Sequence, residues 1–411
     1  MISSLKTNHR KADATINHIK ALGFNRSTGT TGETKALIYI ENELEKEGID
    51  SHSEYFSFSG PRRLFMRLIY IIAFTYLLLF KMWLIILAFF AIKYLFGTLR
   101  RYSLIEKEQS KNLVSRIPAV NSEGKRPVII LSAHYDSVSS YVPYKLQHVF
   151  FALFRFIMIP YLLVSIGFAS LVVFDQIFGG GDPQLIFYTA LYTLIGQLIV
   201  VTLVVLLIYD PKNSQGSIDN ASGVAVLIEL AKKLYDQPLE NMDVICIWTG
   251  AEEWGMIGSK HYVKRHIDEF KEIYDLDNSF HVNFDMVGSY IGLVDKTGLF
   301  KKRINTSLND IIDNSANELD IPIDRYPKII NPRSDHKKFR KIGKKSKSAF
   351  QIACFHSKDD SKYIHSLNDT PDKCSPEALN GCVKICDRTF RKINRSLKNR
   401  RLEVVNLKEI R

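Results

Sequence analysis

The sequence has little of what marks several protein classes. It holds five cysteines in 411 residues, and they form neither a CxxC pair nor a framework of regular spacings. Reduced thiols are therefore expected, which argues against a disulfide-stapled secreted fold, and the lack of a CxxC pair argues against a thiolate metal site. Internal repeats are absent from the sequence, and its first ten residues are polar, so no secretory signal is predicted.

Acidic residues are also few relative to basic ones, and the formal net charge is +12. Such an excess suits a nucleic acid or a membrane surface. The most basic segment runs from Arg333 to Lys347, and aromatic residues, on which unpaired bases stack, are sparse within it. No nucleic-acid partner is therefore predicted. We interpret the segment as a solvated face, with contact to anionic lipid headgroups as the alternative.

Apolar residues, in contrast, are concentrated between Leu64 and Tyr209. The block from about His148 to Tyr209 is divided by the turn Gly179-Gly-Gly-Asp-Pro183 and is predicted to form a transmembrane hairpin. The earlier block, Leu64 to Leu99, is too long for one straight span, because about 34 helical residues reach about 50 Å. It is predicted to form two helices with Lys81 at the far turn, either as two short spans or as a re-entrant or interfacial pair.

The two apolar blocks interrupt what is otherwise the pattern of one soluble domain. Strand-like and helix-like segments alternate outside them, which is typical of an α/β sheet with helices on both faces. We predict one discontinuous domain made of residues 1–60, 111–144 and 211–411, with insertions at 61–110 and 145–210. Because both ends of each insertion return to the same domain, each insertion should cross a membrane an even number of times.

The charges around the insertions predict an orientation. The far loop of the second hairpin carries Asp182 and no Lys or Arg, whereas the domain-side flanks are basic. The positive-inside rule therefore places the α/β domain on the cytoplasmic side of the cell membrane, although Lys81 departs from the pattern. The flanking cations are Arg62, Arg63, Arg100, Arg101, Lys145 and Lys212.

The strand expected at residues 243–248 leads into two adjacent carboxylates, Glu252 and Glu253. Adjacent side chains at the end of a strand point in different directions. One of them can therefore bind a metal while the other takes a proton from water. Taken alone, the pair has a simpler interpretation as two solvated acids in a loop.

Four further stretches place suitable side chains beside predicted elements. The carboxyl ends of strands in an open α/β sheet meet at one edge, which is where such sheets bind ligands. Each residue taken alone favours a structural role, as a turn histidine or a helix cap. The residues are His134 and Asp136 after a strand at 128–131, Asp219 before a helix, Asp285 after a strand at 279–284, and His365 in the loop ahead of the last helix.

Counting donor atoms predicts a metal centre. Two imidazoles and three carboxylates, without a thiolate, suit two divalent ions, for which we predict zinc. If Asp219 bridges the ions, each has three protein ligands: His134 and Asp285 hold one, and Glu253 and His365 hold the other.

Two acids remain outside this ligand set. Glu252 is free to act as the general base that activates a hydroxide shared by the two metals. Asp136 shares a face with His134, so it can hold the imidazole in the tautomer that a metal ligand needs.

The motifs also follow a familiar order: His-x-Asp, Asp-Asn-x-Ser-Gly, Ala-Glu-Glu-Trp-Gly-x-x-Gly-Ser, Asp-Met-Val-Gly, Ser-Asp-His and His-Ser-x-x-Asp-Thr. This order resembles the two-zinc exopeptidases of peptidase clan MH, typified by bacterial leucine-type aminopeptidases, over the whole soluble part of the chain. The resemblance implies a three-layer α/β/α sandwich around a mixed, mostly parallel sheet. It implies metal roles for His134, Asp219, Glu253, Asp285 and His365, a base role for Glu252 and an orienting role for Asp136.

Two positions depart from the family's pattern. Ile364 precedes the last histidine where family members often have Tyr, and Tyr363 lies one place earlier, which puts an oxyanion role for Tyr363 in doubt. The connection from His134 to Asp219 spans about 85 residues, far more than in the family, because the second hairpin is inserted there.

The resulting expectation is a membrane-anchored, zinc-dependent exopeptidase, with peptides as substrate and the lipid bilayer as partner. Hydrolysis of N-terminal peptide bonds is the first choice. Two alternatives remain open: a glutaminyl cyclase, which would use the same scaffold with one zinc, and a non-catalytic membrane receptor or scaffold. The stretch Ala251 to Ser259 fits a peptidase better than a cyclase.

Overall fold

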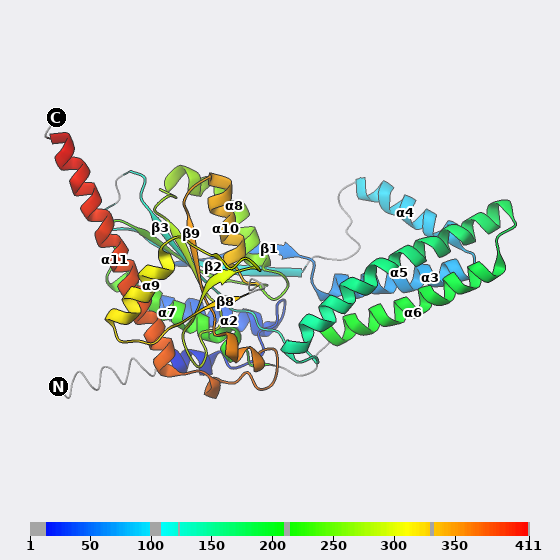
Figure 1. The fold of residues 1–411 in the computed structure, drawn as a ribbon, viewed down its shortest axis with the longest axis horizontal. Coiled ribbons are helices and arrows are strands. Elements are labelled where there is room, and N and C mark those ends of the chain that lie inside the picture. The colour runs from blue at the N-terminus through cyan, green and yellow to red at the C-terminus, as the bar shows by residue number, and fades with distance from the viewer. Residues whose placement is uncertain (1–13, 99–107, 122–123, 209–213, 329–332, 410–411) are drawn as a thin grey trace. The chain divides into compact units, whose positions relative to one another are not determined.

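The computed structural model describes residues 14–98, 108–121, 124–208, 214–328 and 333–409. The chain divides into two compact units, both drawn in Figure 1. The sheet unit comprises Met1–Phe56, Gln109–Ser139 and Lys212–Arg411, and the helical unit comprises Ser57–Glu108 and Ser140–Pro211. The cations Arg100, Arg101 and Lys212 and the block end Leu99 lie outside the described residues.

A sheet of nine strands, counted over the described residues, forms the centre of the sheet unit. Its order is β1-β2-β4-β3-β5-β9-β6-β7, and β8 pairs with β6. The strands are β1 (Ser51–Phe58), β2 (Glu108–Ile117), β3 (Val128–His134), β4 (Asp243–Thr249), β5 (Phe280–Phe284), β6 (Gly292–Thr297), β7 (Lys302–Arg303), β8 (Asp324–Lys328) and β9 (Gln351–Phe355).

The four central strands of the sheet are parallel, and the next strand on each side of them pairs antiparallel. Strands β4, β3, β5 and β9 run in the same direction, whereas β2 pairs antiparallel with β4, and β6 with β9. Parallel strands are covered on both faces, which explains why β3 and β4 are uninterrupted buried runs. The predicted mixed, mostly parallel sheet is confirmed, and the carboxyl ends of its four central strands lie along one edge.

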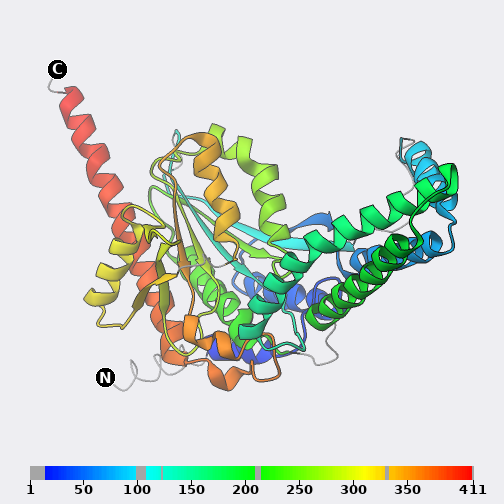
Figure 2. The same ribbon diagram turned by 45° about the vertical axis from the view of Figure 1, so that its right-hand side comes forward.

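Helices cover both faces of this sheet (Figures 1 and 2). On one face α7 (Ser222–Asp236) packs on β3, β4 and β5, and α2 (Thr31–Glu45) and α11 (Pro376–Glu409) pack on α7. On the other face lie α8 (Ile257–Ile273) and α10 (His336–Ser346), while α9 (Leu308–Glu318) contacts β9 and α11. A cluster of buried side chains joins the second face of the sheet to its helices. The members of this cluster include Val128, Ile130, Ile245, Ile247, Tyr262, Phe270, Phe339 and Ile342. The predicted three-layer sandwich is therefore confirmed.

Some elements differ from the sequence-based expectation. The segment Arg333–Lys347, interpreted only as a charged face, contains the helix α10, because Phe339 and Ile342 bury one side of it. Strands β6, β7 and β8 carry a weaker apolar pattern, since they lie toward the edge of the sheet and are partly exposed. Their pairing depends on partners distant in sequence, which a local pattern does not reveal.

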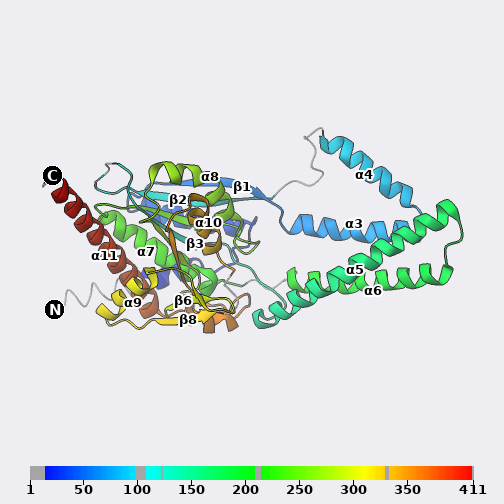
Figure 3. The ribbon, with the colours of Figure 1, turned by 45° about the horizontal axis from the view of Figure 1, so that its top comes forward.

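The helical unit consists of two helical pairs (Figure 3). The first pair is α3 (Pro61–Leu79) and α4 (Trp83–Thr98), and the turn between them contains Lys81, as predicted. The second pair is α5 (Tyr144–Phe178) and α6 (Pro183–Ile208), which pack on each other. Lys81 Nζ lies 2.9 Å from Oδ2 of Asp175, near the end of α5. The lysine in the turn between α3 and α4 therefore has an anionic partner.

Within the described residues, α5 and α6 are long enough and apolar enough to cross a membrane, judged by length and composition alone. The apolar parts of α3 and α4 are shorter. Large apolar side chains on α5 and α6 are exposed, among them Phe156 (79%) and Leu198 (69%). A soluble protein rarely exposes apolar surface on this scale, so these helices call for an apolar environment.

Candidate metal centre

The predicted site residues converge at the carboxyl edge of the central strands. His134 is the last residue of β3, and Asp285 directly follows β5. Glu252 and Glu253 lie in the turn between β4 and α8. Asp219 comes from the short segment ahead of α7, so one end of the sheet and one helix entrance build the site together.

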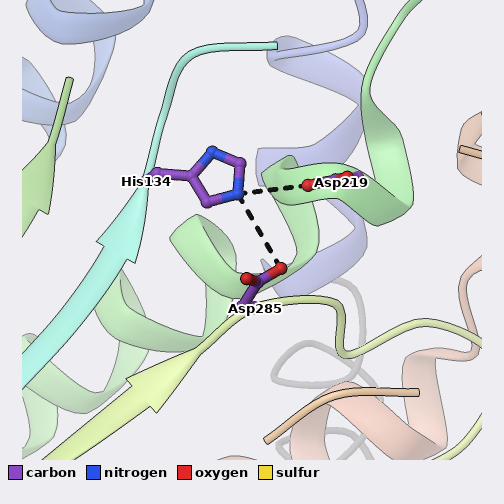
Figure 4. Close-up of side chains that lie close together, drawn as sticks. All are labelled: His134, Asp219 and Asp285. Carbon is purple, nitrogen blue, oxygen red and sulfur yellow. Dashed lines mark ion pairs between the residues drawn. The ribbon is translucent and has the colours of Figure 1, made fainter. Parts of the chain in front are cut away.

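One group of potential ligands surrounds His134. Its Nε2 lies 3.1 Å from Asp219 Oδ1 and 3.8 Å from Asp285 Oδ1. Figure 4 shows both carboxylates facing this nitrogen from different elements. The three side chains are buried, and their ligand atoms lie within 4.8 Å of one another. The spacing suits one metal ion.

A second group surrounds His365, whose Nε2 lies 3.3 Å from Asp219 Oδ2 and 3.3 Å from Glu253 Oε1. These three ligand atoms also lie within 4.8 Å of one another. Asp219 therefore belongs to both groups and turns one carboxylate oxygen toward each histidine. This is the arrangement expected of a bridging carboxylate between two cations.

Acidic side chains are crowded at this site. Five carboxylates and two imidazoles share this small buried region, and Asp136 is fully buried within it. Oε1 of Glu252 and Oε1 of Glu253 are buried and accept no hydrogen bond within the described part of the chain. Buried carboxylates are stable only when paired or bound to metal. Nitrogen and oxygen donors without sulfur fit zinc or a similar divalent ion.

The pKa values reflect this crowding. Burial alone would lower the pKa of His134, but Asp136, Asp219 and Asp285 raise it well above its usual value. Burial would raise the pKa of Asp219, yet hydrogen bonds from His134 and His365 lower it. Burial raises the pKa of Glu252 well above its usual value; the charge of His134 opposes this shift, and the carboxylates of Asp335, Glu253 and Asp285 add to it.

The turn that carries Glu252 and Glu253 is tightly determined. Ala251 adopts a left-handed φ of 54°, which is uncommon for a residue with a side chain. The amide of Ile257 donates to the Ala251 carbonyl at 3.0 Å, and the amide of Gly258 donates to the Gly250 carbonyl at 3.1 Å. The turn closes on itself and fixes where the two carboxylates project.

Asp136 holds this turn in place. Its carboxylate accepts the backbone N–H groups of Glu252 at 3.1 Å and Glu253 at 3.2 Å, and the Thr28 hydroxyl at 3.0 Å. His134 Nδ1 lies 3.7 Å from that carboxylate but only 3.1 Å from the Asp136 backbone oxygen. Asp136 thus contacts the imidazole through its carbonyl and the Glu252–Glu253 turn through its carboxylate.

Asp369 and Asn220 position the segment that carries Asp219. Asp369 accepts the backbone N–H groups of Ile218 at 2.5 Å and Asp219 at 3.3 Å. Asn220 donates to the Phe284 carbonyl at 2.8 Å and thereby ties the segment to the end of β5. Both residues are part of the motifs quoted above, but the sequence alone indicated no role for them.

Arg26 is a site neighbour that the sequence did not reveal. Its fully buried guanidinium donates to the carbonyls of Tyr135 at 2.8 Å, Gln215 at 2.6 Å and Gly216 at 2.8 Å. Burial lowers its pKa to about 10. It clamps the segment after His134 to the segment before Asp219, which are the two ends of the long insertion. A single arginine in a polar loop carries no sequence signal of this role.

In the described part of the chain, the Tyr363 ring contacts lysine side chains and none of the candidate ligands. Its ring is 4.9 Å from Lys362 Nζ and 5.8 Å from Lys373 Nζ, both cation–π distances. Ile364 is 3% exposed and takes the buried place directly before His365. These contacts give no support to an oxyanion role for Tyr363.

Comparison with known proteins supports the resemblance. The sequence profile of "Peptidase family M28" matches residues 202–389. Aminopeptidase YwaD of Bacillus subtilis is 42% identical over 76 residues, which are 18% of this chain and 16% of that protein. The probable lipoprotein aminopeptidase LpqL of Mycobacterium tuberculosis is 42% identical over 72 residues, 17% of this chain and 13% of that protein. The matched part therefore spans only 13–16% of these relatives' length.

Solved structures share the fold over most of the chain. The aminopeptidase from Aneurinibacillus sp. strain AM-1 has a TM-score of 0.54 at 16% identity, covering 93% of both chains. The glutaminyl cyclase of an Acidobacteriales bacterium has a TM-score of 0.53 at 16% identity, covering 94% of both chains. At such identities the likeness shows the fold alone, and two different reactions occur on it.

Proposed function

We propose that the chain, whose residues 202–389 match the profile of peptidase family M28, is a zinc-dependent aminopeptidase that hydrolyses N-terminal peptide bonds. The observation that supports the proposal most is the position of Asp219, which presents one oxygen to each of two ligand groups. A two-metal site of this kind is typical of aminopeptidases.

In this proposal one zinc ion is held by His134, Asp285 and Asp219, and the other by Asp219, Glu253 and His365. Bound zinc would lower the pKa of water toward about 7 and polarise the scissile carbonyl. The protein contributes a buried donor set whose negative charge matches two divalent cations.

Glu252 is the proposed general base. It is 7% exposed, belongs to neither ligand group, and its Oε1 accepts no hydrogen bond among the described residues. Its carboxylate takes a proton from the attacking water as the carbon–oxygen bond forms. It then passes the proton to the amine that leaves when the carbon–nitrogen bond breaks.

Asp136 is the proposed orienting residue. Through the backbone N–H groups of Glu252 and Glu253 it fixes the base and one ligand at the same time. Its backbone carbonyl lies 3.1 Å from His134 Nδ1, so the other nitrogen, Nε2, is left to face the metal.

We further propose that the helical unit anchors the enzyme in the cell membrane with the sheet unit on the cytoplasmic side. The exposed apolar side chains of α5 and α6 and the length of both helices support anchoring. The pairing of Lys81 with Asp175 supports a far turn that can leave the bilayer without an isolated charge.

Hydrolysis of free and N-blocked dipeptide amides by detergent-purified protein tests this function. An aminopeptidase cleaves only the substrates with a free amino terminus. Release of cyclised glutamine by protein with one zinc would instead identify a glutaminyl cyclase. Absence of both metal and turnover would favour a receptor or scaffold.

Replacement of the base tests the mechanism. Glu252→Gln keeps the size of the side chain but cannot accept a proton, so turnover should fall by about 10²–10⁴-fold. The metal content should stay at the wild-type level, because Glu252 is outside both ligand groups. Normal turnover by this variant would refute the assignment.

A further inference from the structure

Helix α10 presents a face of positive charge. His336, Phe339, Ile342 and Gly343 are buried on one side of the helix, and no acidic residue occurs between His336 and Ser346. Lys341, Lys344 and Lys345 are exposed, and Lys338 is half-buried. Arg333 before the helix and Lys347 after it are also exposed. The apolar residues of α10 thus pack in the core, and its outer face carries lysine side chains.

Four lysines of α10 have no ion-pair partner among the described residues. Over the described residues, Lys338, Lys341, Lys344 and Lys345 form no ion pair. On α11, by comparison, Lys398 lies 2.9 Å from Glu240, and Arg391 lies 2.9 Å from Asp387. Some cations of α11 are therefore paired with acids, whereas these four lysines of α10 are not.

The neighbouring helix α8 extends the same charge. Helices α8 and α10 pack side by side in Figures 1 and 3. Lys260 and Lys264 of α8 are exposed. Partial burial lowers the pKa of Lys338, and repulsion from Lys341 and Lys260 lowers it further. The cations are therefore close enough to repel one another, and an anionic partner would relieve that repulsion.

A lipid surface fits this face better than a nucleic acid or an acidic peptide. Aromatic rings for base stacking are missing from its outer side, because Phe339 is buried. Lysines bind as point charges without demanding one geometry, which suits a fluid lipid surface.

We propose that the exposed face of α10, together with Lys260 and Lys264 of α8, binds the surface of a membrane that contains anionic lipids. The inference rests on the membrane anchoring proposed above. Lysines near an anionic leaflet each strengthen binding several-fold, and the effect is confined to about one Debye length, roughly 10 Å at moderate salt. Contact should therefore depend on both lipid charge and ionic strength.

Lysine labelling of the full chain in lipid nanodiscs tests the proposal. One set of discs contains only phosphatidylcholine, and the other also contains phosphatidylglycerol. Low-extent acetylation followed by mass spectrometry gives the reactivity of each lysine. Lys341, Lys344 and Lys345 should react several-fold more slowly in the anionic discs, and high salt should remove the difference. Lys301 and Lys302, exposed at the β6–β7 turn, are internal references and should not change.

Matched variants distinguish the effect of the α10 lysines from the effect of the net charge of the protein. Lys341→Gln, Lys344→Gln and Lys345→Gln combined should abolish the lipid-dependent protection of Lys260 and Lys338. The control, Lys35→Gln, Lys301→Gln and Lys302→Gln combined, removes the same charge from other exposed positions and should retain it.

The remaining outcomes each contradict the proposal in a distinct way. Equal labelling in both kinds of disc overturns the lipid contact but leaves anchoring and catalysis untouched. Protection by glycerol phosphate in neutral discs would show a site for soluble phosphates instead of a lipid surface. Failure of the chain to enter either disc would overturn the anchoring and this inference together, while peptide hydrolysis in detergent would still stand.

Discussion

Glu252 and Glu253 are adjacent in sequence, yet their surroundings give them different chemistry. Glu253 Oε1 lies 3.3 Å from His365 Nε2 and belongs to a ligand group, whereas Glu252 belongs to neither ligand group. The left-handed backbone at Ala251 and the two amides held by Asp136 produce this divergence. At the scale of single residues, the site is therefore made by backbone geometry as much as by the choice of acids.

Another buried acid, Glu33, gives a prediction on pH dependence. Glu33 is 5% exposed, accepts the Gly29 N–H at 2.6 Å and is hydrogen-bonded to Ser110, and burial raises its pKa to about 7. A raised folded-state pKa favours the protonated form, so its stabilising contribution is complete below the unfolded value near 4.5 and is lost as the pH rises through about 7. The free energy of unfolding that is lost between these two pH limits is on the order of 3 kcal/mol.

Glu33→Gln should remove this loss, because glutamine stays neutral and can still accept from Gly29 and donate to Ser110. The difference in melting temperature, variant minus wild type, should therefore increase as the pH rises from about 5 to 8. Glu45→Gln, at an exposed position of the same helix, is the control. A pH-independent difference for Glu33→Gln would contradict the burial of a titrating carboxyl here.

At the scale of elements, the first turn of α8 has no room for a side chain at Gly258. A Cβ there would lie 2.3 Å from Asn112 Oδ1 and 2.4 Å from the Gly250 carbonyl oxygen. Gly258→Ala should therefore displace the turn that carries Glu252 and Glu253. We expect a stability loss of about 1–3 kcal/mol, with weaker zinc retention and lower turnover.

Gly167→Ala is the matched control for Gly258→Ala. Gly167 is also helical, and a Cβ there meets nothing within 4 Å. This change should be neutral or stabilising by up to about 1 kcal/mol, because alanine has the higher helix propensity. Thermal unfolding and zinc content after dialysis measure both variants. Unchanged zinc content and turnover in Gly258→Ala would show that the turn is less constrained than its contacts indicate.

The burial of each strand decided whether it could be predicted from the sequence. Strands β3, β4 and β5 are continuous buried runs, so their ends, and with them His134, Glu253 and Asp285, were located from the sequence. Strands β6 and β8 were missed, because they are short and partly exposed and depend on long-range pairing.

The supporting residues of the site were harder to predict than the candidate ligands. Arg26, Thr28 and Asn112 act through hydrogen bonds to segments more than 100 residues away in sequence. Donor type and spacing can indicate a ligand, but a contact made only after folding leaves no local pattern. The outer face of α10 was visible as charge, whereas its helical form required the burial of Phe339 and Ile342.

At the scale of the whole molecule, all five proposed ligands belong to the sheet unit, and the second insertion lies between His134 and Asp219 in sequence. We propose that the insertion anchors the enzyme and does not build the metal centre. Ser139 and Ser214, near the two ends of the insertion, are joined by a hydrogen bond of 2.6 Å, and Arg26 clamps the adjoining segments. The ligand loops are thus connected to each other within the sheet unit itself.

Deletion of residues 149–207 tests this division of roles. The shortened chain keeps α3 and α4 and should associate with membranes more weakly than the full chain. The two chains are compared for zinc content and for hydrolysis of small amides. Zinc content should be unchanged, since the ligands and the Arg26 clamp remain, while solubility or substrate preference should change. Loss of zinc from a folded deletion variant would show that the insertion supports the metal centre.

The most direct test of the two-metal site is the zinc content of three proteins: wild type, Asp285→Ala and Asp219→Ala. Asp285 belongs to one ligand group and Asp219 to both. We predict about two zinc ions per chain in the wild type, about one in Asp285→Ala and less than one in Asp219→Ala. A wild-type protein with a single zinc, or equal zinc content in the two variants, would contradict a centre bridged by Asp219.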